Sequence, residues 1–447
     1  MISPLDDPSP LPRAYADDAP QVVQAGTLVG AAEADVAIVG GGFTGVSAAF
    51  HLAQGGLRPI LLEARSIGAG AAGRNFGQVV PYTKHSEAQV LAHFGEERGQ
   101  RLIAAAAAAP DLVFSLIESC AISCWAARKG LLFAAHTPAA ESSLRTRAAF
   151  WQKHDAPVEM LGATATREHI GSDLYSAALF DRRGGTINPL AFVRGLANAA
   201  GRLGATFHEG TRVRSLDRAG AKWRLRTDEG TLEVKTVLLA SDAYTDGFAP
   251  AIQRAMIPLR AYQVVSQPLS ENVRRTILPY GQPLTDTRRL FSGVRLHPTG
   301  RLHVSLDGPP FQASGEPFYA TAVRRVAKLY PHLGDLEWSE SWSGWVGMTA
   351  DHYPRLIKMG PDLLGALGFS GRGIALATLF GRELARHALG TPESDLVLPF
   401  MPPEPIRVKP FSRPLVGGLI NLYRVLDGID DRRLQRREQR NTHALEG

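Results

Sequence analysis

The apolar positions of this chain form their clearest pattern between Asp35 and Arg65. A short apolar run at 35–39 is followed by a helix of small residues at 46–54 and by a second apolar run at 58–62. Strands that are apolar along their whole length and joined by a helix are typical of a parallel sheet covered on both faces. The segment therefore predicts one βαβ unit of an α/β domain.

Beyond this unit the pattern mixes helices with short strands. The leader, 1–33, contains many prolines and aspartates and is expected to form an extended strap. Helices are predicted at 86–119, where Pro110 should kink or end the helix, and at 139–154, 189–203, 321–330 and 371–387. Strands are predicted at 129–134, 205–208, 212–217, 223–227, 232–240, 260–266, 293–297, 301–305 and 363–368. The runs at 260–266, 293–297 and 301–305 are expected to form a second, antiparallel sheet.

The composition fits a cytoplasmic globular protein with two domains. The chain has 447 residues, of which 45% are hydrophobic and 21% charged, and both shares are ordinary. No uninterrupted apolar run reaches the roughly 18 residues that cross a bilayer, and the N-terminal residues lack the features of a secretory signal. The cysteines, Cys120 and Cys124, are too few for a disulfide framework or a Cys-rich metal site, and no metal is expected.

The net charge of +6 is concentrated toward the end of the chain. Residues 402–447 hold nine Arg or Lys against six Asp or Glu, with the densest part at 431–440. This tail is either a solvated helical end or a contact for an anionic surface or partner, including a membrane surface. No basic stripe with interleaved aromatic residues is found in the body of the chain, so nucleic acid is not an expected partner.

The βαβ unit contains the spacing G-x-G-x-x-G at Gly40, Gly42 and Gly45. The first glycine permits a tight turn, the second lets backbone N–H groups approach a pyrophosphate, and the third lets the helix pack closely on the strand. Glu63 follows the second strand, where it can accept hydrogen bonds from ribose hydroxyls. With strand, helix and terminal acid all in place, the unit predicts a dinucleotide site.

Three further segments indicate FAD in particular. Gly68–Gln78 is a glycine-rich loop with polar groups at its end, and Thr236–Tyr244 is an apolar strand that ends in a turn of small residues. Gly368–Gly373 joins a late strand to a helix, whose N-terminus is expected to face the flavin ring.

With these motifs the chain resembles the D-amino-acid oxidase (DAO) family of FAD-dependent oxidoreductases, and within it the γ-glutamylputrescine oxidoreductase branch. The resemblance covers about residues 30–395 and includes Gly184–Val213, Ile257–Leu269 and Trp342–Leu356. It implies a Rossmann-type α/β domain for FAD and an α+β substrate domain with a mixed or antiparallel sheet. The FAD domain is expected at 34–85, 180–255 and 342–395, the substrate domain at 86–179 and 256–341, and a basic helical extension at 396–447.

The resemblance also implies which residues lie at the cofactor. The βαβ unit is expected to bind the ADP half, Val213 to lie against the adenine through its backbone, and the two glycine-rich turns to flank the isoalloxazine. The residues assigned to the cofactor are Gly40, Gly42, Phe43, Thr44, Gly45, Glu63, Ala64, Arg65, Gly70, Ala71, Arg74, Asn75, Gly77, Gln78, Val213, Ala240, Ser241, Tyr244, Gly344, Gly371, Arg372, Gly373 and Ile374. Relatives with covalent FAD attach it to a Cys in the stretch that matches Ser343–Met348, or to a His in the first glycine-rich loop. This chain has neither, so FAD is expected to be non-covalent.

The implied reaction oxidises a CH–NH group to an imine, with hydride transfer to flavin N5 and hydrolysis by water. The substrate would be an amine or amino acid, such as a secondary amine, an N-alkyl amino acid or a γ-glutamyl polyamine. The candidate catalytic residues are His303, Tyr262, Arg295, Trp345 and His352. Each has a structural alternative: His303 as an ordinary sheet histidine, Arg295 as a structural or surface pair, and the aromatic residues as core packing.

The electron acceptor and one competing class of function stay open. Sarcosine-oxidase-type relatives place a Lys beside the flavin to promote reaction with oxygen, where a loose alignment gives His303. The acceptor is therefore oxygen, or a quinone or protein. The alternative function is a flavoprotein whose FAD serves electron transfer or structure without small-molecule turnover. Action on a modified RNA base, known in one fused branch, is disfavoured because this chain has no fused methyltransferase domain.

Overall fold

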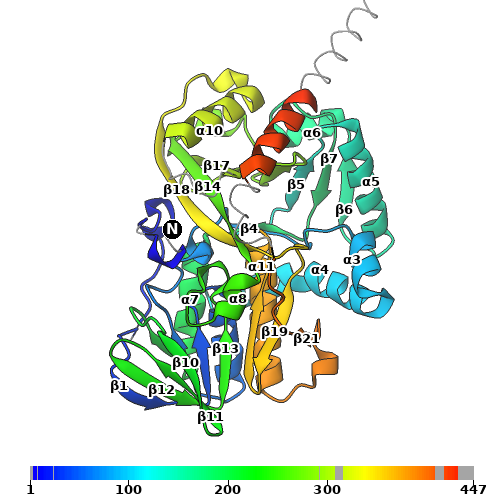
Figure 1. Ribbon diagram of the computed structural model, residues 1–447. Helices are drawn as coiled ribbons and strands as arrows, with labels where there is room; N and C mark the ends of the chain where they lie inside the picture. The colour runs from blue at the N-terminus through cyan, green and yellow to red at the C-terminus, as the bar shows by residue number, and fades with distance from the viewer. Residues whose placement is uncertain are drawn as a thin grey trace, which may run out of the picture. The chain divides into compact units, whose positions relative to one another are not determined.

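The computed structural model describes residues 4–7, 9–23, 25–290, 292–307, 316–407 and 417–430, and its chain divides into two compact units (Figure 1). Unit 1 comprises Met1–Arg128, Arg183–Leu259 and Trp342–Lys409. Unit 2 comprises Lys129–Arg182, Arg260–Ser341 and Pro410–Gly447. Each unit is thus assembled from pieces that are distant in sequence.

Unit 1 is built on a seven-stranded sheet with the order β21-β19-β20-β13-β2-β3-β9. Its strands are β2 (Val36–Val39), β3 (Pro59–Leu62), β9 (Thr206–His208), β13 (Thr236–Leu239), β19 (Arg355–Gly360), β20 (Leu363–Leu367) and β21 (Phe400–Met401). β13, β2, β3 and β9 are parallel to their neighbours, and β20 is parallel to β13 but antiparallel to β19. The carboxyl ends of β2, β3, β13 and β20 therefore share one edge, which is where ligands bind in such sheets.

The helices of unit 1 pack through small residues. α2 (Phe43–Gln54) lies against α7 (Pro189–Arg202) and α11 (Gly373–Ala388). A Cβ atom at Gly381 of α11 would lie 2.3 Å from the carbonyl oxygen of Thr44 in α2, so this close helix pair requires a glycine. The small-residue pattern seen in the sequence thus has a packing reason.

The predicted helix at 86–119 is two helices, α3 (Glu87–Phe94) and α4 (Glu96–Ser119). The chain breaks at Gly95, whose φ of 77° lies in the left-handed region that glycine adopts easily. Of the two outcomes predicted for Pro110, a kink or an end of the helix, the second is wrong, because α4 continues through this buried proline. Packing of α4 on α11 outweighs the missing N–H, and the same packing places residues 86–128 in unit 1 rather than with the predicted substrate domain.

One described helix, α4, is long and apolar enough to cross a membrane by length and composition. Half of its most apolar 18-residue window is buried inside the protein, and core helices of soluble proteins pass the same test. The packing of α4 against α11 identifies it as such a core element.

A four-stranded sheet in unit 1 corrects two predictions. Its order is β1-β12-β11-β10, with β1 at Gly30–Glu33, β10 at Ser215–Ala219, β11 at Lys222–Arg226 and β12 at Gly230–Val234. The leader is not simply an extended strap, since it contains α1 (Arg13–Ala16) and its β1 pairs parallel with β12. The single strand predicted at 232–240 is β12 and β13, which belong to different sheets. The remaining elements of unit 1 are η1 (Pro4–Asp6), η2 (Ala71–Gly73), β4 (Gln78–Val79), β8 (Gly185–Thr186), η3 (Asp242–Tyr244), α8 (Pro250–Arg254) and η5 (Glu393–Asp395).

Unit 2 contains most of an eight-stranded sheet with the order β18-β14-β17-β16-β15-β5-β7-β6. Its strands are β5 (Leu131–Ala134), β6 (Val158–Leu161), β7 (Ala178–Asp181), β14 (Ile257–Pro268), β15 (Leu284–Asp286), β16 (Ser292–Leu296), β17 (Arg301–Asp307) and β18 (Trp338–Met348). The pairing of β15 with β5 is parallel and the other pairings described are antiparallel, which matches the mixed sheet expected from the sequence. The helical elements are α5 (Pro138–Gln152), α6 (Ala163–Ile170), α9 (Glu271–Arg274), α10 (Glu316–Leu329), η4 (Pro331–Leu333) and a last helix at 417–430.

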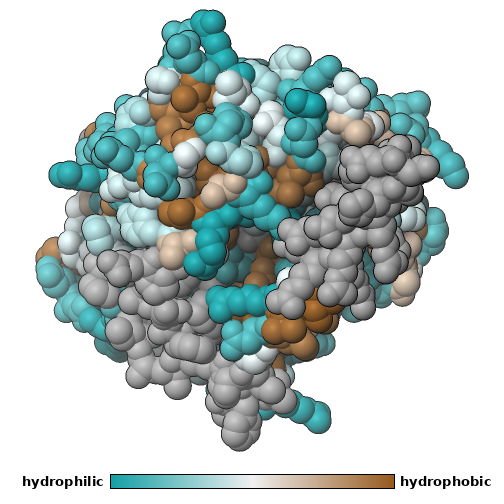
Figure 2. All heavy atoms as spheres, turned by 90° about the horizontal axis from the view of Figure 1, so that it is seen from above, coloured by the Kyte–Doolittle hydropathy of each residue, from teal (hydrophilic) through white to brown (hydrophobic). Residues whose placement is uncertain are grey.

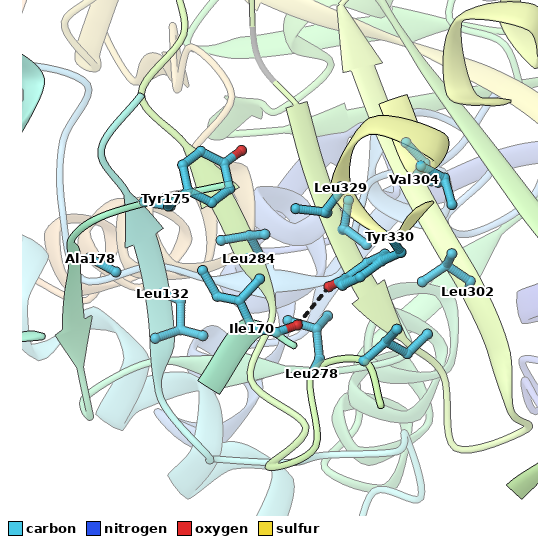
Figure 3. Packing of buried hydrophobic residues seen from close by; sticks show 14 of the residues in the cluster. Leu132, Ile170, Tyr175, Ala178, Leu278, Leu284, Leu302, Val304, Leu329 and Tyr330 are labelled. Carbon is cyan, nitrogen blue, oxygen red and sulfur yellow. Dashed lines mark hydrogen bonds between the residues drawn. The ribbon is translucent and has the colours of Figure 1, made fainter. Parts of the chain in front are cut away.

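The register of this sheet separates an apolar face from a polar one. Val264, Val304 and Val294 lie opposite one another on β14, β17 and β16, and the next residues along, Val265, His303 and Arg295, form the row on the other face. The apolar face carries the core of unit 2, where Leu302 and Val304 pack near Leu329 and Tyr330 (Figure 3). The polar face is buried as well, because His303 is 0% and Arg295 3% exposed.

Candidate cofactor site and candidate catalytic residues

The glycine loop after β2 has one glycine that the fold does not require. A Cβ at Gly45 would lie 2.0 Å from the carbonyl oxygen of Gly40, and one at Gly40 would lie 2.7 Å from that of Ala240. At Gly42 a Cβ would meet, among the described residues, the Cβ of Ala72 at an ordinary 3.8 Å. Internal packing thus accounts for Gly40 and Gly45, whereas no described contact requires a glycine at Gly42, and space for a ligand is left at the start of α2.

Glu63 stands at the carboxyl end of β3 and is linked to this loop. Its Oε2 accepts from the backbone N–H of Gly41 at 2.7 Å, and its Oε1 accepts from that of Arg65 at 2.9 Å. Burial raises the pKa of the Glu63 carboxyl, and these two backbone donors act in the opposite direction. Each carboxylate oxygen can accept a further hydrogen bond. The position therefore fits an acceptor for ribose hydroxyls.

Two arginines assigned to the cofactor hold the N-terminal segment. Arg65 donates to the carbonyl oxygens of Asp7 and Ser9, at 2.9 and 3.2 Å. Buried Arg74 donates to the carbonyls of Ala69, Pro10 and Ser9, at 2.8, 2.9 and 2.6 Å. Both guanidinium groups thus hold the leader, and that of Arg74 also contacts the glycine-rich loop. The sequence offers no sign of this, because the partners in the leader are backbone atoms some 55–65 residues away.

The rest of this loop is shaped by its own hydrogen bonds. The side-chain amide of Asn75 donates to the carbonyls of Ala71 and Ala72, and its oxygen accepts from the N–H of Gly77. A Cβ at Gly70 would lie 3.2 Å from the ring of Tyr244. Asn75 therefore fixes the turn, and Gly70 lets the loop pass close to this tyrosine.

Asp242, in the turn after β13, is a half-buried residue that the sequence analysis missed. Its φ of 40° is in the left-handed region, and its Oδ1 accepts from the N–H of Gly368 at 3.2 Å. Burial raises the pKa of the Asp242 carboxyl, while backbone donors, including Gly347, lower it. Asp242 thereby joins the turns after β13 and β20. The signal that could have identified it is an acid within the small-residue turn that follows an apolar strand.

Ala240, Ser241 and Tyr244, which the sequence analysis assigned to the cofactor, are held by hydrogen bonds in the same turn. The N–H of Ala240 donates to Val39 at 2.8 Å, and the hydroxyl of Ser241 lies 2.7 Å from that of Thr245. The hydroxyl of Tyr244 accepts from the backbone N–H of Trp345 at 3.1 Å. These contacts tie the turn after β13 to β2 and to β18.

Trp345 is a buried residue whose indole N–H donates to the carboxylate of Asp7 at 3.1 Å. A Cβ at Gly344, its neighbour, would lie 3.1 Å from the Cβ of Arg74. The packing alternative given for Trp345 is thus supported by its contacts, and Gly344 permits the close passage of the glycine-rich loop.

His352 lies in a strained turn beside the last glycine-rich segment. Its φ is 62°, and burial lowers its pKa, as do Lys84 and His85. In the same turn the hydroxyl of Thr349 donates to the carbonyl of Tyr353 at 3.1 Å, and a Cβ at Gly368 would clash with both. A non-glycine residue with positive φ next to a ligand-binding turn is a functional candidate. His352 therefore stays a candidate within unit 1.

The turn from β20 into α11 leaves room at its glycines. A Cβ at Gly371 or at Gly373 would meet no described atom within 4 Å, although the φ of 85° at Gly371 itself favours glycine. Ile374 is buried in the first turn of α11. The open space at this helix N-terminus is consistent with a ligand there.

The candidates of unit 2 fall into two environments. Tyr262 is 1% exposed and belongs to the apolar core, which supports the packing alternative. His303 lies in a buried polar cluster: its Nε2 is 2.8 Å from Oε1 of Gln263, and its Nδ1 is 3.0 Å from Nε2 of His297 and 3.4 Å from Nε of Arg295. Burial lowers the pKa of both histidines well below the usual value, and the nearby cations act in the same direction. Both rings are therefore neutral at pH 7.

The structure places Gly40, Gly42, Glu63, Ala240 and Gly371 in the turns that follow β2, β3, β13 and β20, at the carboxyl edge that these strands share in unit 1. Val213 packs nearby in the core that contains Leu62 and Leu225. A parallel sheet with a glycine turn, a helix N-terminus and an acid at this edge defines a Rossmann-type dinucleotide-binding protein.

Comparison with known proteins gives the family. Residues 35–387 match the model of the family described as DAO, FAD dependent oxidoreductase, and the chain belongs to this family. It is 30% identical over 83% of its length to a probable oxidoreductase OrdL of Rhizobium meliloti, covering 86% of that protein. It is 28% identical over 85% of its length to gamma-glutamylputrescine oxidoreductase of Escherichia coli, covering 89% of that protein. The prediction of an FAD-dependent oxidoreductase of the DAO family is therefore confirmed.

Solved structures agree on the fold. Glycine oxidase from Geobacillus kaustophilus matches with a TM-score of 0.68 at 24% identity, over 81% of this chain and 96% of that one. L-proline dehydrogenase from P. horikoshii matches with a TM-score of 0.66 at 20% identity, over 79% of this chain and 92% of that one. The predicted two-part architecture with a Rossmann-type domain is confirmed by these neighbours.

Proposed function

We propose that this protein oxidises the CH–NH group of an amine or amino acid to an imine that water then hydrolyses. The substrate class is a secondary amine, an N-alkyl amino acid or a γ-glutamyl polyamine. The observation that carries the proposal is the buried polar face of the unit 2 sheet, with Arg295, His303 and Gln263, in a chain whose relatives include a gamma-glutamylputrescine oxidoreductase and a glycine oxidase.

The protein side of the reaction is binding and orientation. Bound FAD would supply the two-electron oxidant for the substrate C–H bond, and the substrate nitrogen gives up its proton to complete the imine. The guanidinium of Arg295 provides a fixed cation for a substrate carboxylate. Neutral His303 and His297 lie within hydrogen-bond distance of this guanidinium and help to orient it. A poorly hydrated pocket also lowers the pKa of an amine, which favours the unprotonated form that can be oxidised.

We propose that FAD is held without a covalent bond, through Gly42, Glu63 and the assigned residues around them. In support, Cys120 and Cys124 follow α4, far in sequence from the stretch Ser343–Met348, and burial raises the pKa of the Cys124 thiol to about 12. A neutral, buried thiol is a poor attachment point. Acid precipitation should release yellow flavin into the supernatant, and flavin retained in the protein pellet would contradict this.

The test of the substrate class is anaerobic flavin reduction. The FAD-loaded protein is mixed with primary and secondary amines, N-alkyl amino acids and γ-glutamylated polyamines, and bleaching of the oxidised flavin band is followed. We expect bleaching by at least one of these compounds, and Arg295→Gln should raise the KM for carboxylated substrates more than for simple amines. If dithionite reduces the flavin but none of the compounds does, the alternative of an electron-transfer or structural flavoprotein is favoured.

The electron acceptor is proposed to be a quinone or protein rather than oxygen. In sarcosine-oxidase-type relatives a Lys beside the flavin promotes reaction with oxygen, and a loose alignment gives the neutral His303 in its place. We expect slow reoxidation of the dithionite-reduced protein in stopped-flow with air-saturated buffer, and faster reoxidation with a soluble quinone. Rapid reoxidation by air would identify an ordinary oxidase. The proposal also includes a cytoplasmic location and contact of the basic tail, 414–440, with a membrane surface, although 414–416 and 431–440 lie outside the described residues.

A further inference from the structure

The last described helix, 417–430 in unit 2, presents a row of aliphatic side chains to solvent. Leu419, Leu422, Val425 and Ile429 are 44%, 51%, 59% and 38% exposed. Their spacing of three, three and four residues puts them on one side of the helix. We call this row the aliphatic stripe, and it accounts for four of the large exposed apolar residues described. Hydrophobic residues also reach the surface elsewhere in the view from above (Figure 2).

The acidic residues of this helix face the protein instead. Nη1 of Arg289 donates to Oδ1 of Asp427 at 2.8 Å and to Oδ2 of Asp430 at 2.7 Å. The two aspartate side chains are only 11% and 18% exposed. These ion pairs hold the helix against unit 2 with one face fixed inward, and so they also fix the stripe outward.

His136 lies at the same contact. We call the ion-paired residues Arg289, Asp427 and Asp430 the latch, because they hold the helix, and their chemistry does not favour a metal site. The ligand atoms of His136, Asp427 and Asp430 lie within 4.8 Å of one another, a spacing that could hold a metal ion. The guanidinium of Arg289 already sits on both carboxylates and would repel a cation. Burial lowers the pKa of the His136 imidazole, as does Arg288, so the ring adds no positive charge near neutral pH.

The outward face has the chemistry of a membrane-surface helix. Within the described helix, Arg424 is exposed and charged, whereas the acids are turned inward. The next ten residues in the sequence, 431–440, contain five arginines against two acids. An aliphatic row flanked by arginines is the combination that binds at the interface of a bilayer with anionic lipids. We propose that the aliphatic stripe docks this protein on an anionic membrane surface.

The charges favour a membrane over a second copy of the chain. Two copies joined through the stripe would bring two Arg424 side chains and two arginine-rich tails together, and like charges repel. An anionic bilayer instead attracts each arginine and also accepts the aliphatic side chains. The proposal is independent of which amine is oxidised, although a membrane location would suit transfer of electrons to a quinone.

The experiment uses the full-length, FAD-loaded protein in vesicle co-sedimentation. Vesicles of phosphatidylcholine alone are compared with vesicles that also contain phosphatidylglycerol, at low and high salt. We expect binding to the anionic vesicles that weakens with salt, because exposed charges are screened. Val425→Asp should reduce this binding about tenfold or more, since it places a charge in the stripe. Val29→Asp is the matched control, because Val29 is 70% exposed but lies in unit 1, away from the helix in sequence.

Three results would overturn the proposal. The first is no co-sedimentation of the parent protein with anionic vesicles at low salt. The second is an equal loss of binding in Val425→Asp and Val29→Asp. The third is a concentration-dependent dimer in light scattering that Val425→Asp abolishes, which would assign the stripe to a second copy. Flavin reduction by substrate is measured in the same samples, so a failure of the proposed reaction is distinguished from a failure of membrane docking.

Discussion

The Oε2 atom of Glu63 accepts a hydrogen bond from the backbone N–H of Gly41 at 2.7 Å. This bond joins the carboxyl end of β3 to the glycine loop after β2. The acid is therefore positioned by the protein itself, and little ordering remains to be done when a dinucleotide binds.

Replacing Glu63 should weaken FAD binding. A charged hydrogen bond contributes roughly 1.5–3 kcal/mol, so Glu63→Ala is expected to lower FAD affinity about 10- to 150-fold. Fluorescence titration of the apoprotein with FAD measures this. Glu33→Ala, which removes an exposed acid of β1, is the control and should leave the affinity unchanged. An unaltered affinity in Glu63→Ala would remove this residue from the site.

Alanine substitutions at two glycines of the loop after β2 should have different effects on protein stability and on FAD binding. Gly42→Ala adds a methyl group that the described packing accommodates, so the thermal stability of the apoprotein should change little while FAD affinity falls at least about tenfold. Gly45→Ala places a Cβ 2.0 Å from the carbonyl oxygen of Gly40 and should destabilise the fold itself. Calorimetry of the apoproteins and FAD titration are the two measurements. Equal loss of stability in both variants would contradict the assignment of Gly42 to the ligand.

The buried histidines of unit 2 should make the protein sensitive to acid. The pKa values of His297 and His303 are lowered well below the usual value, mainly by burial. Between the folded pKa and the unfolded pKa of about 6.5, the unfolded chain binds more protons, so stability falls as the pH drops below about 6.5. Each histidine contributes at most about 1.4 kcal/mol per pH unit.

Denaturant unfolding at a series of pH values tests this dependence. His303→Gln should flatten the slope of unfolding free energy against pH, and the exposed His154→Gln is the control. A slope that is the same in all three proteins would show that these buried rings do not titrate on unfolding.

Loss of Arg289 should release the C-terminal helix. Arg289→Ala leaves Asp427 and Asp430 without their shared guanidinium. Because these ion pairs are partly exposed, the free energy of unfolding should fall by about 1 kcal/mol. Trypsin cleavage after Arg424 should become faster. Arg275→Ala, which breaks the exposed pair with Glu271, should leave the cleavage rate as it is. Equal rates in Arg289→Ala and the parent protein would show that the latch is not what holds the helix.

Some of the sequence predictions rest on local patterns, and these hold in the structure. The βαβ unit lies within about 30 residues, and each of its parts is required by backbone geometry or by contact with the next. The positions of Gly40, Gly45 and Glu63 in the βαβ unit can therefore be predicted from residue type and spacing. The alternation along β16 and β17 likewise predicts strands without knowledge of their partners.

What the tertiary structure decided depends on contacts between distant segments. The inward turn of Asp427 toward Arg289, the hydrogen bond of Asp242 to Gly368, and the split of residues 232–240 between two sheets all join segments that local periodicity cannot relate. Pro110 shows the same principle, because packing of α4 on α11 overrides its helix-breaking tendency. The sequence by itself determined the cofactor fold, since that signal is short-range. The tertiary structure alone decided which polar groups are buried together, because burial is set by the whole chain.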